Sequence, residues 1–154
     1  MGDMIYFAYG SNMSTDRLRD RIQELTPIGL ARLPKHALCF HKKSKDGTGK
    51  CNASFTGNES DQVLGVLFRI PTEKKNVLDR FEGAGYGYQA KDITVIQPNG
   101  AVISAATYLA SPEYINEALR PTKEYRQFVL DGAQEHGFPA SYISEIAAVP
   151  VMED

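Results

Sequence analysis

The sequence predicts an α+β fold with about seven strands, mostly antiparallel, and three to four flanking helices. Short strand patterns follow one another with turn signals between them, among them Asn99-Gly100, a strong hairpin signal. Other segments repeat apolar residues at the spacing of one helix face. Strands joined by hairpins form an antiparallel or mixed sheet, which can curl into a barrel. This excludes a doubly wound nucleotide fold.

The N-terminal half begins with an aromatic run at Met4–Tyr9, which ends at a glycine and predicts a buried strand. A helix is expected over residues 14–25, because its leucines and isoleucine recur on one face. Its N-cap is Ser14 or Asn12. A hairpin is expected to enclose the basic segment Lys42–Lys50. The strands expected after the helix are 29–34, 37–41, 51–55 and 62–70.

The C-terminal half supplies the remaining elements. A short helix opens at Pro71-Thr72, and Gly83 occupies the position that follows its last turn. The longest helix then begins near Thr122 and is stopped by Gly137. The other expected elements are strands at 89–96 and 101–109 and helices at 122–136 and 139–147.

Length and charge restrict the class of protein. The chain has 154 residues, which predicts one domain, residues 1–154. Its net charge is −2, so no nucleic-acid partner is expected. No apolar run approaches the roughly 18–20 residues that cross a bilayer, so no membrane partner is expected either. The acidic start, Met1–Met4, does not resemble a signal peptide, and the expected location is cytoplasmic.

The cysteines and histidines do not suggest a metal site. Cys39 and Cys51 make no disulfide framework and are expected to be free thiols in a reducing compartment. His36 and His41 lie close by in the sequence, but the four residues lack the spacing of paired zinc ligands. No metal is expected, and no Ser-His-Asp grouping indicates a nucleophile.

The stretch from Arg32 to Lys50 is basic, with Asp46 as its only acidic residue. The favoured interpretation is a solvated hairpin tip. The alternative is a lid that attracts a small carboxylate. Nucleic-acid binding through this hairpin is a third and weaker interpretation, given the net charge of the chain.

The first candidate site is Tyr9-Gly10-Ser11-Asn12, where a strand ends just before a helix. Gly10 lets the backbone turn without a Cβ clash. The N–H groups that follow then form a small cradle for an anion or oxyanion, with Ser11 and Asn12 adding side-chain donors. The ordinary alternative is turn and capping chemistry, which the spacing alone favours.

The second candidate is Glu82, at the predicted C-terminus of a helix and beside a glycine-rich stretch. The negative end of the helix dipole and partial burial both raise the pKa of such a carboxyl group. Glu82 is therefore a candidate general acid and base. The alternative is a solvated acid at a helix end, which is how we interpret Asp79 and Glu73.

The chain has eight tyrosines and no tryptophan. Tyrosine offers an apolar wall with a polar tip, which suits a pocket for a small polar substrate. Core packing is the ordinary role of most of them. The tyrosines that fall at element ends or beside the two candidate sites are Tyr9, Tyr88, Tyr108 and Tyr125.

These residues together resemble a known family. The segment Phe7–Met13 resembles the opening YGSN loop of the γ-glutamylcyclotransferases, and Leu78–Gly83 resembles their catalytic-glutamate segment. Tyr108-Leu109 and Gly132–Tyr142 are similar to the C-terminal half of that family, which shares the AIG2-like fold. The likeness covers nearly the whole chain. Two motifs in this order, about seventy residues apart, are a specific signal, whereas either alone is weak.

The resemblance implies a small mixed β-barrel with a pocket at the strand ends. It implies that Glu82 is the general acid and base and that no cofactor or metal takes part. Relatives can be dimers, so the resemblance allows a homodimer. The residues implied to bind substrate are Tyr9, Gly10, Ser11, Asn12, Tyr88, Tyr108 and Tyr125.

The function implied is cyclisation of a γ-glutamyl amino acid or amine to 5-oxoproline, with release of the free amine. The Gly10–Asn12 amides would hold either the glutamyl carboxylate or the developing oxyanion. Two alternatives stay open. One is a non-catalytic module of the same fold that binds a small metabolite, because fold does not guarantee activity. The other is an enzyme that removes a γ-glutamyl group from a specialised acceptor.

Overall fold

The computed structural model describes residues 2–153, so Met1 and Asp154 of the predicted domain lie outside the described residues. The strands are β1 (Asp3–Ala8), β2 (Thr26–Pro34), β3 (His36–Lys43), β4 (Gly49–Phe55), β5 (Gln62–Pro71), β6 (Tyr88–Ile96) and β7 (Val102–Ala110). The α-helices are α1 (Thr15–Ile22), α2 (Lys75–Glu82), α3 (Lys123–Glu135) and α4 (Ala140–Ala147). Short 3₁₀ helices are η1 (Ser11–Met13), η2 (Thr72–Lys74) and η3 (Pro112–Tyr114). The predicted α+β class is confirmed.

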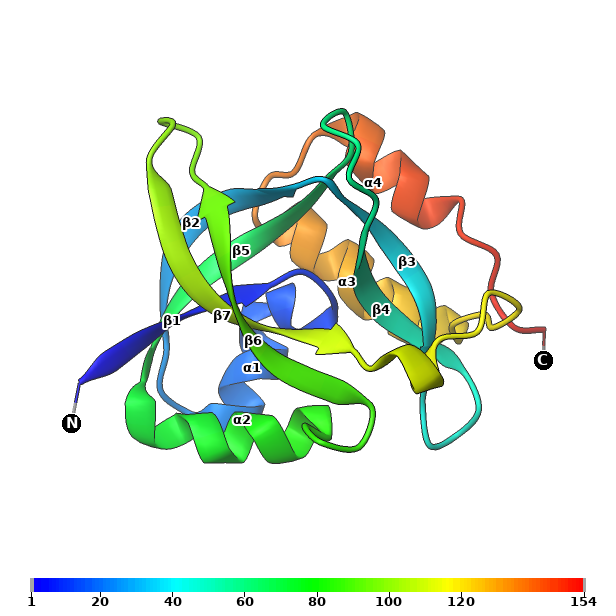
Figure 1. Ribbon diagram of the computed structural model, residues 1–154, viewed down its shortest axis with the longest axis horizontal. Coiled ribbons are helices and arrows are strands. Elements are labelled where there is room, and N and C mark those ends of the chain that lie inside the picture. Colours follow the sequence, from blue (N-terminus) through cyan, green and yellow to red (C-terminus); the bar gives the residue numbers. More distant parts are fainter. Residues whose placement is uncertain (1, 154) are drawn as a thin grey trace.

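Five strands close a mixed barrel in the order β1-β5-β2-β6-β7 (Figure 1). Its neighbouring strands are antiparallel except β1 and β7, which pair in parallel at Tyr6 and Ala106. The strands β3 and β4 form a separate two-stranded sheet, so the barrel has fewer strands than the seven expected. Among the described residues, no backbone ladder joins this small sheet to the barrel. Instead, the Asn52 side chain of β4 accepts a hydrogen bond from the Ala110 N–H of β7 at 2.8 Å.

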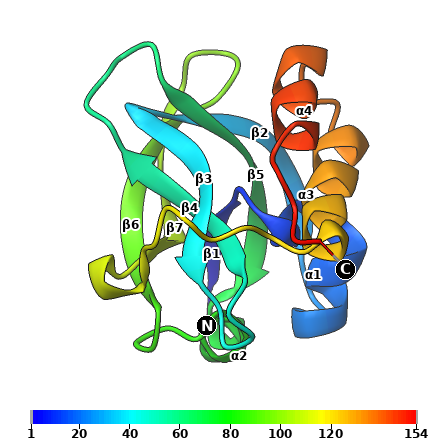
Figure 2. The same cartoon turned by 90° about the vertical axis from the view of Figure 1, so that its right-hand side faces the viewer.

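Three helices form one layer along a side of the barrel, while α2 lies beneath it (Figure 2). The Ser14 side chain caps α1 by accepting from the Arg17 N–H at 3.4 Å. The helix ends at Ile22, earlier than the predicted end at residue 25, because Gln23 takes a φ of 65°. That turn lets β2 start at Thr26.

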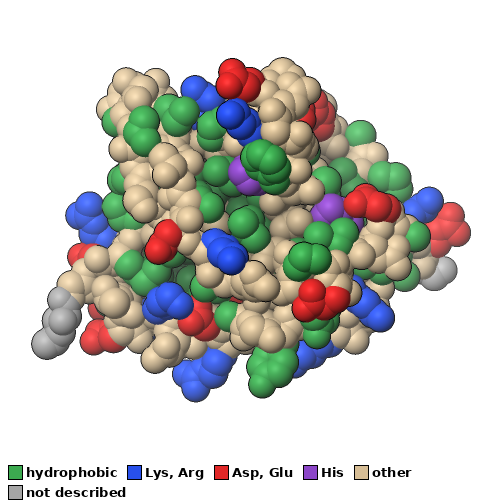
Figure 3. Space-filling view, viewed as in Figure 1, with side chains coloured by type: hydrophobic (Ala, Val, Ile, Leu, Met, Phe, Trp, Pro, Cys, Tyr) green, Lys and Arg blue, Asp and Glu red, His purple; other side chains and the backbone are tan. Residues whose placement is uncertain are grey.

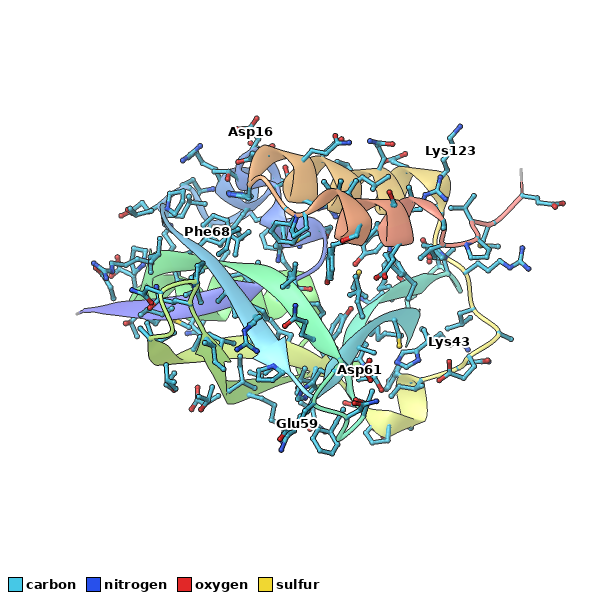
Figure 4. The ribbon with its side chains drawn as sticks, turned by 90° about the horizontal axis from the view of Figure 1, so that it is seen from above. Asp16, Lys43, Glu59, Asp61, Phe68 and Lys123 are labelled. Atoms are coloured by element: carbon cyan, nitrogen blue, oxygen red, sulfur yellow. The ribbon has the colours of Figure 1, made fainter. Side chains whose placement is uncertain are left out.

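The helical layer packs closely on the barrel and on η1. Phe68 of β5 is buried beside this layer, with its ring centroid 6.0 Å from that of His136 (Figure 4). At Gly132 of α3, a Cβ atom would lie 2.6 Å from Met13 Cβ, so glycine allows α3 to contact η1. Through this contact, α3 packs against the segment that follows β1 and helps to hold it in place.

The helix α2 carries the second candidate motif to the end of the barrel. Leu78 is its buried residue. The helix ends at Glu82, and Gly83 follows with a φ of 64°, as predicted for its terminating glycine. Within residues 2–153, no helix is both long enough and apolar enough to cross a membrane.

Candidate active site

The two candidate motifs meet in one small cavity at the end of the barrel. All the predicted site residues line it: Glu82, the loop Tyr9–Asn12, and Tyr88, Tyr108 and Tyr125. The cavity volume is about 30 Å³, which is room for about two water molecules or one carboxylate group. The fold therefore brings together residues that lie more than a hundred positions apart in the sequence.

Asn12 links the loop to the glutamate. Its Nδ2 atom donates to Glu82 Oε1 at 2.5 Å and to the Tyr6 hydroxyl at 3.0 Å. Its Oδ1 atom accepts from Arg21 Nη1 at 3.2 Å. The Asn12 side chain, predicted as a donor towards substrate, is thus occupied in orienting the carboxylate of Glu82.

Burial and nearby cations have opposite effects on the pKa of Glu82. Burial raises this pKa above its ordinary value and is the largest effect. The cations of Arg21, Lys42 and Arg17 and the hydrogen bond from Asn12 lower it in part. The raised pKa agrees with the predicted direction and suits a group that exchanges protons near neutral pH.

The glycine of the loop lets the chain turn without a Cβ clash, as predicted. The φ and ψ of Gly10 are −118° and −135°. A Cβ atom here would lie 3.0 Å from Cys51 Cβ and 3.4 Å from the Tyr125 hydroxyl oxygen. Glycine therefore allows the loop to approach β4 closely where the chain turns.

The loop leaves hydrogen-bond donors free at the cavity. The Met13 N–H donates to the Gly10 carbonyl at 3.1 Å, and the Ser14 N–H donates to the Ser11 carbonyl at 3.3 Å. Across residues 2–153, no protein hydrogen bond engages the N–H groups of Gly10, Ser11 and Asn12 or the Ser11 hydroxyl. These donors can bind a negatively charged oxygen.

Tyr9, Tyr108 and Asp79 form a chain of contacts along one wall. The Tyr9 hydroxyl donates to the Tyr108 carbonyl, and the Tyr108 hydroxyl donates to Asp79 Oδ1. Asp79 also pairs with Lys75 Nζ at 2.8 Å. The interpretation of Asp79 as a solvated acid is therefore wrong, because it holds a tyrosine of the cavity wall. Glu73 is exposed, as expected.

Tyr88 and Tyr125 form the other wall, on either side of Cys51. The Tyr88 hydroxyl donates to the Cys51 carbonyl at 2.5 Å, and the Cys51 N–H donates to the Tyr125 hydroxyl at 3.1 Å. Burial raises the pKa of both tyrosines, so their hydroxyls stay protonated at neutral pH. Tyr88 and Tyr125 thus belong to the buried core and also line the cavity.

Comparison with known proteins identifies the family. A sequence profile of the AIG2-like family matches residues 62–146. The gamma-glutamylcyclotransferase of Mus musculus is 31% identical over 150 residues, covering 94% of this chain and 78% of that protein. The chain belongs to the AIG2-like family. The predicted resemblance to the γ-glutamylcyclotransferases is confirmed.

Two further relatives support this membership. The gamma-glutamylcyclotransferase of Homo sapiens is 29% identical over 153 residues, covering 94% of this chain and 78% of that protein. A solved structure of a gamma-glutamyl cyclotransferase superposes with a TM-score of 0.90 at 26% identity, covering 99% of this chain and 90% of that one. The AIG2-like fold therefore extends over essentially all of the chain.

Three residues that line the cavity of this AIG2-like protein were not predicted from the sequence: Tyr6, Cys51 and Thr107. Tyr6 could have been predicted on the same grounds as the other tyrosines, because it is an aromatic residue with a polar hydroxyl close to the Tyr9–Asn12 loop. Cys51 and Thr107 carried no such signal, because the packing of β4 beside β7, two strands far apart in the sequence, places them at the cavity. Burial raises the pKa of the Cys51 thiol to about 12, so its thiolate is scarce at neutral pH.

The cysteines agree with expectation, whereas the basic hairpin differs from it in part. Cys39 pairs with Asn52 across the β3–β4 sheet, and Cys39 and Cys51 are both free thiols. Lys42 and Lys50 belong to these strands and are half-buried. Lys42 Nζ lies 4.5 Å from the Tyr88 ring centroid, and Lys50 Nζ lies 4.2 Å from that of Tyr125. The favoured interpretation of a solvated tip is wrong for these two lysines.

Proposed function

We propose that this protein is a γ-glutamylcyclotransferase, which converts a γ-glutamyl amino acid or amine to 5-oxoproline and the free amine. Glu82 is the general acid and base of the proposed reaction. One observation carries the proposal: the partly buried Glu82 carboxylate is held by Asn12 next to a loop with free N–H donors. Membership of the AIG2-like family, with relatives named gamma-glutamylcyclotransferase, supports it.

In the proposed reaction the nucleophile is the α-amino nitrogen of the substrate. Glu82 takes a proton from the α-ammonium group, and the freed nitrogen attacks the γ-carbonyl carbon to form the new C–N bond. The original amide C–N bond then breaks. In total the α-ammonium loses two protons and becomes the lactam N–H, and the leaving nitrogen gains two and departs as an ammonium ion. No water is consumed, and no proton is gained or lost overall.

The remaining residues of the cavity position the substrate. The free N–H groups of Gly10, Ser11 and Asn12 are the donors for a negatively charged substrate oxygen. The tyrosine rings form rigid walls, because their hydroxyls are bound to protein groups. Holding the glutamyl chain folded for ring closure removes part of the entropic barrier. Since the substrate supplies the nucleophile, this reaction requires no cofactor, metal or protein nucleophile.

The identity of the product tests this proposal. Purified protein is incubated in H₂¹⁸O with γ-glutamylalanine and, separately, with γ-glutamylethylamine, and the products are analysed by mass spectrometry. Cyclisation predicts 5-oxoproline without ¹⁸O. Release of glutamate carrying one ¹⁸O would show hydrolysis and contradict the proposal. Binding of either compound without any product would favour a non-catalytic module instead.

A further inference from the structure

A larger cavity lies outside the first one, and the two share Glu82 as part of their walls. Its volume is about 630 Å³. It is bounded by the end of β3 and the following turn on one side, and by the end of α2 on the other. A scissile amide at Glu82 would stand at the junction of the two cavities. A carboxylate of the glutamyl end would enter the inner cavity, which has room for one such group, and the leaving group would remain in the outer one.

The outer cavity is lined by basic side chains. Its wall contains Lys42, Lys43, Lys45 and Arg80, and among the described residues Glu82 is its one acidic member. Within residues 2–153, none of these four cations forms an ion pair with a carboxylate. By contrast, basic and acidic side chains are interspersed on the face seen in Figure 3. The cationic wall is therefore a local feature beside the proposed reaction centre.

The four cations of this wall differ in burial: one is half-buried and three are exposed. Lys42 is half-buried, with its Nζ 4.5 Å from the Tyr88 ring centroid and 5.9 Å from that of Tyr114. Lys43, Lys45 and Arg80 are exposed, so their long side chains can reach an anion in the cavity. Phe81 and Tyr86 add apolar surface, since they are 52% and 77% exposed. This combination suits a leaving group with a methylene chain that ends in a carboxylate.

On the basis of the proposed function, we infer that the outer cavity binds the leaving group and selects one that carries a second carboxylate, such as a dicarboxylic amino acid. A simple amine offers these cations no anion, and a neutral amino acid offers only its α-carboxylate. The second carboxylate meets cations that form no ion pair with a carboxylate of the described residues. The outer cavity thus acts as an electrostatic specificity site.

The test compares two substrates that differ in charge and hardly in shape: γ-glutamylglutamate and γ-glutamylglutamine. Their kcat/KM values are measured by 5-oxoproline formation at low and high salt. We expect γ-glutamylglutamate to be preferred by about tenfold at low salt, and we expect the preference to shrink as salt screens the charges. Equal values at low salt, or a preference for γ-glutamylglutamine, would overturn the inference.

Variants test whether the preference for γ-glutamylglutamate arises from the cations of the outer cavity. The double variant Lys43→Gln/Lys45→Gln is expected to bring the ratio of the two kcat/KM values close to one. The matched control is Lys123→Gln, which removes a lysine at the start of α3, outside the lining (Figure 4). The control is expected to keep the wild-type ratio. If the double variant also keeps that ratio with native circular dichroism, the cavity is not the source of the preference.

The two proposals fail in different ways. If neither dipeptide nor γ-glutamylalanine yields 5-oxoproline, the proposed function is wrong. If both dipeptides yield 5-oxoproline at the same rate, the proposed function stands and the specificity site is wrong. The salt dependence of the wild-type ratio needs no variant, so the inference remains testable even if the double variant does not fold.

Discussion

Asn12 holds Glu82 through a hydrogen bond of 2.5 Å from its Nδ2 to Oε1, although seventy positions separate the two residues. The amide cannot turn freely, because its other contacts go to Tyr6 and Arg21. The loop after β1 therefore orients the carboxylate at the end of α2. In the proposed mechanism, this contact directs the proton-accepting oxygen towards the substrate.

Asn12→Ala is expected to lower kcat by about 10- to 100-fold, because a hydrogen bond to a charged group contributes about 1.5–3 kcal/mol. The kcat values of the variant and the wild type are measured by steady-state kinetics with γ-glutamylalanine. Asn58→Ala, in the turn between β4 and β5, is the matched control and is expected to keep wild-type kcat. A kcat for Asn12→Ala within twofold of wild type would show that this contact does not orient the base.

Arg21→Gln is expected to shift the pH dependence of the rate. Glu82 must be ionised to accept a proton, so the rate rises with pH through its pKa. Arg21 lowers this pKa, and its loss therefore moves the rising limb of kcat/KM to higher pH. Arg21→Lys keeps the charge and is expected to restore the profile. Arg19→Gln, on the same helix, serves as the control, and an unmoved limb in Arg21→Gln would contradict the account.

Asp79 and Tyr108 are expected to be energetically coupled. Asp79→Ala and Tyr108→Phe each remove the same hydrogen bond, so the double variant should lose less stability than the two single losses added together. The coupling energy expected from chemical denaturation is about 0.5–3 kcal/mol. Glu73→Ala, at an exposed site, should change the free energy of unfolding by less than about 0.5 kcal/mol. Simple additivity would show that Asp79 does not hold the tyrosine.

Substitutions of two glycines are expected to have different main effects: Gly10→Ala on activity and Gly132→Ala on stability. In Gly10→Ala the new Cβ crowds Cys51 Cβ at 3.0 Å beside the cavity, so kcat/KM should fall about tenfold. In Gly132→Ala the Cβ meets Met13 and the backbone of Ser14 at 2.6–2.8 Å, so the free energy of unfolding should fall by about 1–3 kcal/mol. Kinetics and thermal unfolding of both variants check this. Loss of stability alone in Gly10→Ala would show that the glycine serves only packing.

Local patterns in the sequence predicted most of the fold. Strand alternation, helix spacing and the turn residues are local signals, and they located the seven strands and four helices of the described chain to within a few residues. The closure of the barrel by five strands was not predictable in this way. It depends on the parallel pairing of Tyr6 with Ala106, a hundred positions apart. The Asn52 contact between β4 and β7, which attaches the separate two-stranded sheet, was not predictable either.

The candidate site was predictable where a motif marked it. Glu82 and the Tyr9–Asn12 loop were found because motifs in order are specific, and the tyrosines because they lie near them. The partners of these residues were not found. Asp79 looks like any acid on a helix, and Lys42 like any lysine in a hairpin, until the fold places Tyr108 and Tyr88 beside them.

The most direct test of the account is the rate of 5-oxoproline formation by Glu82→Gln, measured beside wild type and Glu73→Gln. Glutamine has nearly the same shape as glutamate but cannot exchange the proton. The account predicts a rate lower by about 10²–10⁴ in Glu82→Gln, with native circular dichroism and retained substrate binding, and an unchanged rate in Glu73→Gln. Near-wild-type turnover by folded Glu82→Gln would contradict the central role of Glu82.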